Sequence, residues 1–218
     1  MLRLDFTRED RTPLKVLVLG SHSDDIEIGT GGSLLKLLAG EQQLDIKWVV
    51  FSAIGERAPE AASSAAAFLQ GAHNSDVMLH AFRDGYFPQH GAEIKDRFEE
   101  LKAQFEPDVI LTHHSADCHQ DHRVVCELTW NTFRNHLILE YEIPKYDGDL
   151  GQPNLFVPLE QSVCNQKCDL LLEHFKTQST KHWFTRDTFL ALMRVRGLEA
   201  NSPTLFAEAF HARKMTLG

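Results

Sequence analysis

Two short segments of the chain combine imidazoles with carboxylates. The first, residues 22–27, reads HSDDIE and directly follows the apolar run 16–20. The second, residues 119–122, reads HQDH and follows shortly after the apolar run 109–112. A short apolar run is typical of a buried strand, and open parallel sheets bind their ligands beyond the carboxyl ends of the strands. The two segments therefore predict one mononuclear metal site with catalytic side chains beside it.

The residue types suit zinc. Imidazole nitrogen and carboxylate oxygen are both zinc ligands, and a catalytic zinc usually has three protein ligands and one position open for water. His22, Asp25 and His122 would supply such a set. Zn²⁺ is the predicted cofactor, with iron or cobalt as alternatives because ligand type alone does not determine the metal.

Two further side chains are predicted to take part in catalysis. Asp24 is one carboxylate more than the ligand set needs, and it leaves the backbone in a different direction from Asp25. It is free to act as a base on a water whose pKa zinc lowers to about 7. His119 falls in the loop before a helix that opens at Asp121, where an imidazole suits an acid or an oxyanion partner.

A helix N-cap is the alternative for the aspartate pair. Aspartate is favoured at N-caps, and a helical leucine pattern follows at residues 34–38. Capping does not explain His22, nor the cluster of further histidines between residues 113 and 122.

Both segments resemble the signatures of a known family, the PIG-L/LmbE-like zinc de-N-acetylases. Residues 19–32, LGSHSDDIEIGTGG, are similar to the first signature, A-H-P-D-D-x-E-x-G-x-G-G. Residues 107–123, PDVILTHHSADCHQDHR, are similar to the second, P-D-x-[VIF]-x-T-H-x-x-x-D-x-H-P-D-H-R. A weaker similarity continues to residues 206–210, so the resemblance covers most of the chain.

The resemblance implies the same zinc ligands and the same base as the residue types do. It also implies that His119 assists the tetrahedral intermediate and the leaving group, and that Asp121 tunes the imidazole of His119. Ser23 and Gln120 stand where the signatures have proline. Because proline restrains the backbone without supplying a ligand, these departures question the rigidity of the loops more than the chemistry.

Two residues are predicted to bind substrate. Arg57 follows the second predicted strand and resembles the family's R-x-x-E element, whose arginine reaches substrate hydroxyls, although the segment is shorter than usual. The alternative is a solvated arginine paired to Glu60. Asp84 follows the third predicted strand and resembles a family position that contacts the sugar, with a turn aspartate as the alternative.

The alternation of strand-like and helix-like segments predicts an α/β fold, with a Rossmann-like, mostly parallel sheet and helices on both faces. Residues 144–153 are rich in turn residues and are predicted to form a long loop, a candidate lid over the site. The predicted strands are 15–19, 46–51, 76–80, 109–112, 137–141 and 205–210. The predicted helices are 32–39, 60–69, 94–105, 121–135, 164–177 and 188–196.

Three glycines raise nucleotide binding as a further alternative. Gly29, Gly31 and Gly32 lie between a predicted strand and a predicted helix, where dinucleotide-binding folds hold a pyrophosphate. The pattern lacks the third glycine of G-x-G-x-x-G, and Asp24 and Asp25 would repel a phosphate. The preferred interpretation is close packing of this helix on the sheet.

The four cysteines are too few and too scattered for a disulfide framework. Cys164 and Cys168 lie four residues apart on a predicted helix and are predicted to be a reduced, buried pair. Cys118 adjoins His119 and is predicted to lie at the rim of the pocket, with a competing soft metal ligand as the alternative.

Composition and the start of the chain together predict a cytoplasmic enzyme. The 218 residues, 43% of them hydrophobic, can bury one substantial core, so residues 1–218 are predicted to form a single PIG-L/LmbE-like domain. A formal net charge of -9 argues against nucleic-acid binding. The start, MLRLDF, lacks an apolar signal segment, and no run reaches the ~20 apolar residues of a spanning helix. The oligomeric state stays open, a homo-oligomer included.

The sequence therefore predicts a zinc-dependent hydrolase that removes acetate from an N-acetylated amino sugar or sugar conjugate of GlcNAc type, a small-molecule substrate. One alternative is a zinc amidase acting on a larger acyl or thiol conjugate. Another is a metal-binding protein without catalysis, which the presence of Asp24 argues against because a degenerate homologue would tend to lose the base.

Overall fold

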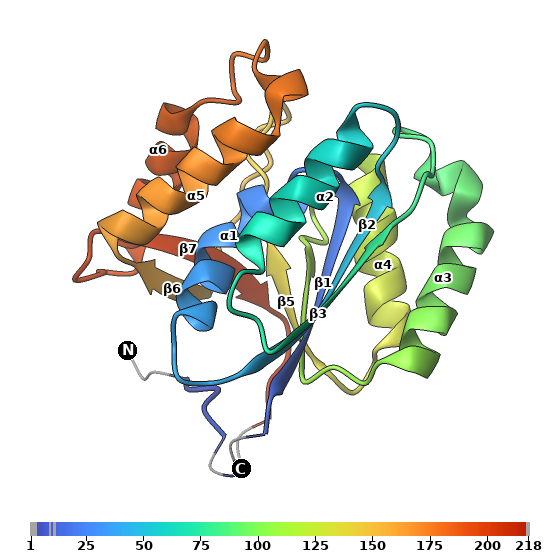
Figure 1. Ribbon diagram of the computed structural model, residues 1–218, viewed down its shortest axis with the longest axis horizontal. Coiled ribbons are helices and arrows are strands. Elements are labelled where there is room, and N and C mark those ends of the chain that lie inside the picture. Colours follow the sequence, from blue (N-terminus) through green and yellow to red (C-terminus); the bar gives the residue numbers. More distant parts are fainter. Residues whose placement is uncertain (1–3, 9, 11, 217–218) are drawn as a thin grey trace.

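One seven-stranded sheet organises the protein, in the strand order β3-β2-β1-β4-β5-β7-β6 (Figure 1). The computed structural model describes residues 4–8, 10 and 12–216, so the prediction drawn from the start of the chain lies in part outside it, at Met1 to Arg3. The strands are β1 (Leu14–His22), β2 (Leu44–Ser52), β3 (Asn74–Leu79), β4 (Val109–His113), β5 (Leu137–Tyr141), β6 (Leu155–Leu159) and β7 (Phe206–Ala212). The helices are α1 (Asp25–Leu38), α2 (Arg57–Phe68), α3 (Gly91–Gln104), α4 (Gln120–Thr132), α5 (Gln161–His174) and α6 (Arg186–Glu199), with short 3-10 turns η1 (Phe87–His90) and η2 (Lys176–Gln178).

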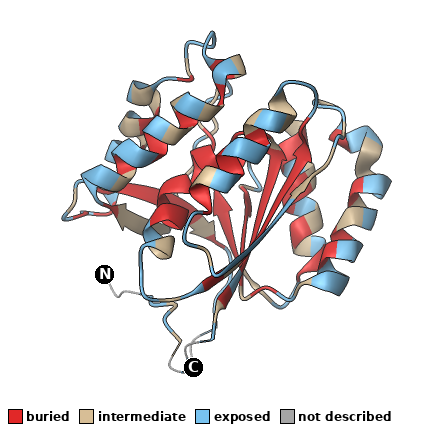
Figure 2. Cartoon of the chain, in the orientation of Figure 1, coloured by how far each residue is buried: buried red, intermediate tan, exposed pale blue. Residues whose placement is uncertain are grey.

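The first five strands are parallel, and β7 is antiparallel to both β5 and β6. The predicted mostly parallel α/β fold is confirmed. The central strands are buried on both faces, as Figure 2 shows by their colour. Along β1, Val16 and Val18 pack into one hydrophobic core, and Leu17 and Leu19 pack into the other. Successive strand residues point to opposite faces, so a continuous apolar run is what two covered faces require.

Helices cover both faces of the sheet (Figure 1). Side chains of α1, α2, α5 and α6 belong to one core, and those of α3 and α4 belong to the other. Strand β6 was not predicted. It contains Pro158 and lies at the edge of the sheet, the position where a strand tolerates proline.

Helix α1 begins at Asp25, seven residues before the predicted start at residue 32. The first half of α1 was not predicted because it contains three glycines, and glycine has a low helix propensity and adds nothing to an apolar periodicity. Their use is close packing, as preferred from the sequence. A Cβ added at Gly29 would lie 2.1 Å from the Tyr141 ring of β5, and one added at Gly31 would lie 2.6 Å from Phe68 of α2.

A buried ion pair joins the middle of α1 to the C-terminal part of the chain. Glu208 of β7 accepts hydrogen bonds from the backbone N–H groups of Gly32 and Ser33, at 2.8 and 2.7 Å. Lys167 of α5 donates to Glu208 and to the carbonyl of Ile28, both at 2.6 Å. The pair therefore ties the backbone of α1, at the turn where its glycines pack closely, to α5 and β7.

Other predictions can be compared with the structure directly. Cys164 and Cys168 are buried free thiols, as predicted, and Cys118 is an exposed free thiol. Residues 144–153 form an irregular segment between β5 and β6. Among the helices of the described residues, we find none with the length and apolarity needed to cross a membrane.

The contact of Gly29 with Tyr141 gives the first testable expectation. Gly29→Ala should lower the free energy of unfolding by about 1–3 kcal/mol, the usual range for overpacking a tight core. Urea denaturation followed by circular dichroism measures this. Gly91→Ala is the matched control, because a Cβ there meets open space at the start of α3 and its effect should stay near zero or be slightly stabilising. Equal stability of both variants would contradict the packing assigned to Gly29.

Candidate metal centre

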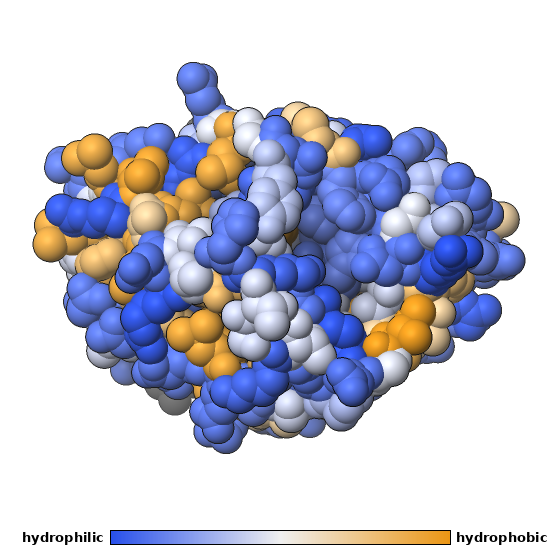
Figure 3. All heavy atoms as spheres, turned by 90° about the horizontal axis from the view of Figure 1, so that it is seen from above, coloured by the Kyte–Doolittle hydropathy of each residue, from blue (hydrophilic) through white to orange (hydrophobic). Residues whose placement is uncertain are grey.

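The two segments that combine imidazoles with carboxylates, residues 22–27 and 119–122, meet at the carboxyl ends of the neighbouring strands β1 and β4. His22 is the last residue of β1 and Asp25 the first residue of α1. His122 lies in the first turn of α4, shortly after β4, the neighbour of β1. The strand order reverses between β1 and β4, and such a switch point is where open α/β sheets form their binding crevice. Seen from above, this face is largely hydrophilic around a hollow near its centre (Figure 3).

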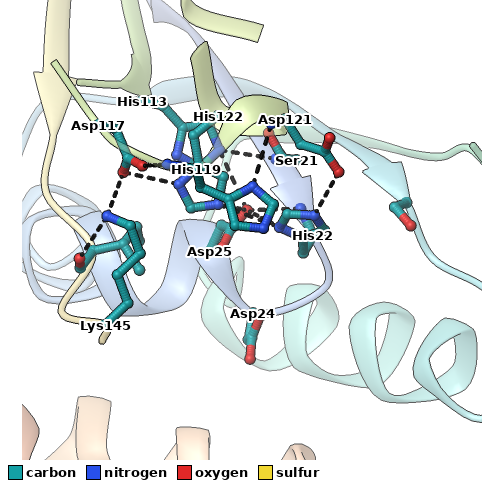
Figure 4. Close-up of polar contacts among 12 residues, drawn as sticks. Ser21, His22, Asp24, Asp25, His113, Asp117, His119, Asp121, His122 and Lys145 are labelled. Atoms are coloured by element: carbon teal, nitrogen blue, oxygen red, sulfur yellow. Dashed lines mark hydrogen bonds and ion pairs between the residues drawn. The ribbon is translucent and has the colours of Figure 1, made fainter. Parts of the chain in front are cut away.

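Three potential ligand atoms converge there (Figure 4). His22 Nδ1 lies 3.2 Å from Asp25 Oδ2 and 3.3 Å from His122 Nε2. His122 Nε2 lies 3.4 Å from Asp25 Oδ2. Two ligands of a tetrahedral zinc, each about 2.0–2.1 Å from the metal, are about 3.3–3.4 Å apart. The three atoms therefore have the mutual spacing of a tetrahedral zinc ligand set, and the residues fit the metal.

Buried carboxylates orient both imidazoles. His122 Nδ1 lies 2.9 Å from Asp117 Oδ2, and His22 Nε2 lies 3.2 Å from Asp121 Oδ2. A carboxylate beside one ring nitrogen holds the proton there, which leaves the lone pair of the other nitrogen free. Both free lone pairs then belong to the converging atoms, His22 Nδ1 and His122 Nε2.

Other groupings of histidine and aspartate at this edge are less suited to a metal. Asp25, His113 and His122 also lie close together, but His113 Nε2 accepts the backbone N–H of Ser21 at 2.9 Å, so its lone pair is already used. Instead His113 stacks on His122, with ring centroids 3.9 Å apart. It therefore supports the site by packing.

A second such grouping joins His22 to two carboxylates, Asp84 and Asp121. The Asp121 carboxylate already accepts the backbone N–H groups of Gly85 and Phe87, and Asp84 is 69% exposed. These carboxylates are better placed to orient His22 than to bind a metal. A third grouping adds His119 to His22 and His122, at the open side of the site.

The charges around the converging atoms favour a cation. Burial would lower the pKa of His22, but Asp25 and the hydrogen bond to Asp121 raise it well above its usual range. Burial would raise the pKa of Asp25, but His122 and His22 lower it well below its usual range. Without metal, protons on the imidazoles balance the Asp25 carboxylate. A divalent metal would replace those protons and release them on binding.

Asp24 occupies the N-cap position of α1, but its side chain makes no capping hydrogen bond. It lies 2.9 Å from Arg57 Nη2 and is buried. Burial raises the pKa of Asp24 and Arg57 opposes the shift, with a net rise. The capping alternative is therefore wrong for this side chain, and a buried carboxylate with a raised pKa has the properties of a general base.

His119 lies just before α4, as predicted. It also caps the helix, because its Nδ1 accepts the backbone N–H of Asp121 at 3.3 Å. Burial, followed by the neighbouring His122 and His22, lowers the pKa of His119. The ring is therefore neutral near pH 7, and its proton is on Nε2. A neutral imidazole with a free Nε2–H can donate a hydrogen bond to a developing oxyanion.

Asp121 acts on the pKa of His119 through charge: its carboxylate raises that pKa, against the effect of burial. The carboxylate turns toward the 84–87 segment and His22, and only the backbone amide of Asp121 reaches His119. The reason is local: Asp121 lies in the first turn of α4, where its side chain meets the backbone N–H groups of that segment.

The predicted substrate residues lie at the same edge. The Nε of Arg57 is 3.9 Å from Glu60, so its pairing with Asp24 is the closer contact. Asp84 lies in a turn, and its Oδ1 is 3.1 Å from His22 Nε2. Both residues therefore contact the segment that carries the converging ligand atoms, Arg57 at Asp24 and Asp84 at His22.

The two departures from proline each add a hydrogen bond. Ser23 Oγ donates to the carbonyl of Ser52, at the end of β2, and Gln120 Nε2 donates to the carbonyl of Gly85, both at 3.2 Å. These bonds tie the two loops to neighbouring segments, so the loops are restrained despite the loss of proline.

Two residues of the site received no role from the sequence. Asp117 accepts from His122 and from the backbone N–H of His119, at 2.9 and 2.8 Å. Its place in the second signature was the available signal. Lys145, from the irregular segment after β5, lies 2.9 Å from Asp117. Nothing in the local sequence around Lys145 indicated that contact.

Comparison with known proteins agrees with this geometry. The family model of GlcNAc-PI de-N-acetylase, PIG-L, matches residues 17–133. No curated protein sequence matches the chain.

Solved structures share the fold at low identity. One is N,N'-diacetylchitobiose deacetylase from Pyrococcus horikoshii, with 18% identity, a TM-score of 0.72, and coverage of 94% of this chain and 86% of that chain. Another is 4-carboxy-2-hydroxymuconate hydratase from Pseudomonas putida, with 15% identity, a TM-score of 0.71, and coverage of 94% and 98%. A third is teicoplanin deacetylase in a zinc-inhibited form, with 11% identity, a TM-score of 0.68, and coverage of 90% and 96%. Identities this low show similarity of fold alone.

The converging atoms give an expectation for metal binding. Purified protein should bind about one zinc ion per chain, and His22→Ala, Asp25→Ala and His122→Ala should each weaken binding at least ~10-fold, because a three-ligand site loses one ligand. Titration against a chromophoric zinc chelator measures the affinity. His73→Ala is the control outside the site, because this histidine pairs with Asp45 just before β3, at the amino end of the parallel strands, and its loss should leave zinc affinity unchanged. Full retention of zinc affinity in all three ligand variants would rule out this centre.

Proposed function

Because the chain belongs to the PIG-L family of GlcNAc-PI de-N-acetylases, we propose that it hydrolyses the acetamide of an N-acetylated amino sugar or sugar conjugate, with zinc as its cofactor. The observation that carries the proposal is the convergence of His22, Asp25 and His122 beside a buried carboxylate, Asp24, that has no capping role. The products would be acetate and the free amine.

The proposed ligands are His22 Nδ1, Asp25 and His122 Nε2. Zinc, when bound, would polarise the acetyl carbonyl and lower the pKa of a water molecule. Asp117 and Asp121 fix the tautomers of the two imidazoles, so both rings present a lone pair without rearrangement.

Asp24 is the proposed general base. Its carboxylate takes a proton from the attacking water and passes it to the departing amine. Its burial and its raised pKa suit proton transfer near neutral pH better than an exposed aspartate would. The contact with Arg57 holds Asp24 in one orientation and limits how far its pKa rises.

His119 is the proposed oxyanion partner. Its Nε2–H donates to the oxygen that gains negative charge as water attacks the acetyl carbon. The Asp121 amide holds the ring of His119, and Asp117 holds its backbone, so the donor is oriented before the reaction begins.

Arg57 and Asp84 are the proposed substrate contacts. One offers hydrogen-bond donors and the other acceptors, which suits the neighbouring hydroxyls of a sugar. Their positions beside Asp24 and His22 support contact with the part of the substrate next to the acetamide.

The hydratase of similar fold supplies a second candidate, addition of water to a carbon–carbon double bond. The match to a de-N-acetylase family model over residues 17–133 favours amide hydrolysis. A zinc amidase for larger acyl groups would use the same centre. Release of acetate from an N-acetylated substrate separates these possibilities.

The role of Asp24 can be tested by Asp24→Asn, which keeps the shape of the side chain but cannot accept a proton. We expect zinc binding to persist and kcat to fall at least ~100-fold, as for loss of a general base. Steady-state kinetics and metal analysis on the same preparation provide both readouts.

Arg57→Ala serves as the comparison, because it removes the ion pair and leaves the base. If Asp24 acted only by holding Arg57, Asp24→Asn and Arg57→Ala would both raise KM, and both would keep kcat close to the wild-type value. Turnover of Asp24→Asn at the wild-type rate would exclude Asp24 as the base.

Substrate class can be tested with a panel of N-acetylated sugars, sugar conjugates and simple acetamides, assayed for acetate. We expect GlcNAc-type compounds to have kcat/KM at least ~100-fold above that of simple acetamides, because contacts to the sugar align the acetyl group for attack. Arg57→Ala should raise KM for the sugars, whereas any loss of kcat from a less restrained Asp24 should be the same for sugars and acetamides. Equal rates on both classes would favour the broader amidase function.

A further inference from the structure

An ammonium and an imidazole share a single oxygen atom next to the candidate metal centre. Lys145 Nζ and His122 Nδ1 each lie 2.9 Å from Asp117 Oδ2 (Figure 4). The other oxygen of the same carboxylate, Oδ1, accepts the backbone N–H of His119. Lys145 therefore shares this acceptor oxygen with His122.

Lys145 is held in this position from its other side. Its Nζ also lies 2.6 Å from Asp149 Oδ2, which accepts the backbone N–H of Cys118. The lysine side chain is only 11% exposed. Burial disfavours its charge, but hydrogen bonds to Asp149 and Asp117 outweigh burial and raise the pKa of Lys145, so the group is a cation.

We propose that Lys145 is a positioning residue that limits the electron donation of His122 to the metal by drawing charge from Asp117. The inference rests on the proposed function of this centre. A carboxylate that hydrogen-bonds a ligating imidazole makes the imidazole a stronger donor. A cation on the same oxygen weakens that effect, and it leaves more positive charge on the metal to polarise the substrate.

Removing the charge of Lys145 should therefore strengthen zinc binding while slowing the reaction. Two effects act in the same direction: His122 becomes a better donor, and one positive charge that repels a divalent cation is lost. Asp117 keeps its bonds to His122 and His119, and its side chain is almost fully buried, so its orientation persists.

A purely structural lysine would behave differently. If Lys145 acted only as a tether for the segment between β5 and β6, its loss would loosen Asp117 and His122, and zinc would bind more weakly. The sign of the change in zinc affinity separates the two roles, and it does not depend on any substrate.

The experiment compares Lys145→Met with Lys145→Arg by competition for zinc with a chromophoric chelator. For Lys145→Met we expect zinc to bind about 3- to 10-fold more tightly and kcat to fall by about the same factor, with little change in KM. This is less than the roughly 10- to 100-fold effect of losing a direct partner of a ligand, because Lys145 acts one contact further out. Lys145→Arg keeps the charge and should restore both values to near wild type.

Two variants serve as controls. Asp149→Asn removes the charge of the other partner of Lys145, so the ammonium interacts mainly with Asp117. Zinc affinity should then stay the same or fall, whereas it should rise in Lys145→Met. Lys47→Met removes a comparably buried lysine, 9% exposed and 2.6 Å from Asp76, at a distance from the site. Its zinc affinity and kcat should stay at wild-type values.

Weaker zinc binding in Lys145→Met, or a change of the same sign in Asp149→Asn, would overturn the proposal in favour of a tether. Unchanged affinity would overturn it as well. A protein that binds zinc with the expected signs but releases no acetate would retain this role for Lys145 and reject the deacetylase function.

Discussion

The approach of α1 to the sheet is the constraint on which the site depends. Gly29 has no side chain, so the helix backbone lies against the Tyr141 ring, and Tyr141 in turn donates from its hydroxyl to the carbonyl of Leu19 in β1. This contact sets the distance between the start of α1 and the end of β1. Asp25, in the first turn of the helix, then comes within 3.2–3.4 Å of the nitrogens of His22 and His122.

Residues from the C-terminal part of the chain stabilise α1 in this close approach. At the glycine-containing turn of α1, Glu208 and Lys167 make hydrogen bonds to its backbone. Buried charges are stable only when paired and hydrogen-bonded, and these two are both. The C-terminal strand and α5 therefore stabilise a helix whose first residues form the candidate centre.

Around the converging atoms, carboxylates determine what each imidazole can do. Asp117 and Asp121 decide which nitrogen of His122 and of His22 has a free lone pair, and the backbone amide of Asp121 does the same for His119. Three histidines of similar sequence context thus acquire two functions, two as potential ligands and one as a hydrogen-bond donor. The difference arises from their partners, because imidazole itself can serve in either role.

The sequence by itself determined the parallel α/β architecture, since runs such as 16–20 must be buried on both faces, and it identified His22, Asp25, His122, Asp24 and His119 by residue type and signature. It missed the first half of α1, because glycines chosen for close packing carry no helical periodicity. Only the tertiary structure decided that Asp121 faces His22, and that Lys145 shares an oxygen of Asp117 with His122. Asp121 and His22 are 99 positions apart in the chain, and Lys145 and Asp117 are 28 apart. Their contacts depend on how helices and loops meet at the sheet edge. Local sequence patterns report only on neighbouring residues, so they cannot predict such contacts.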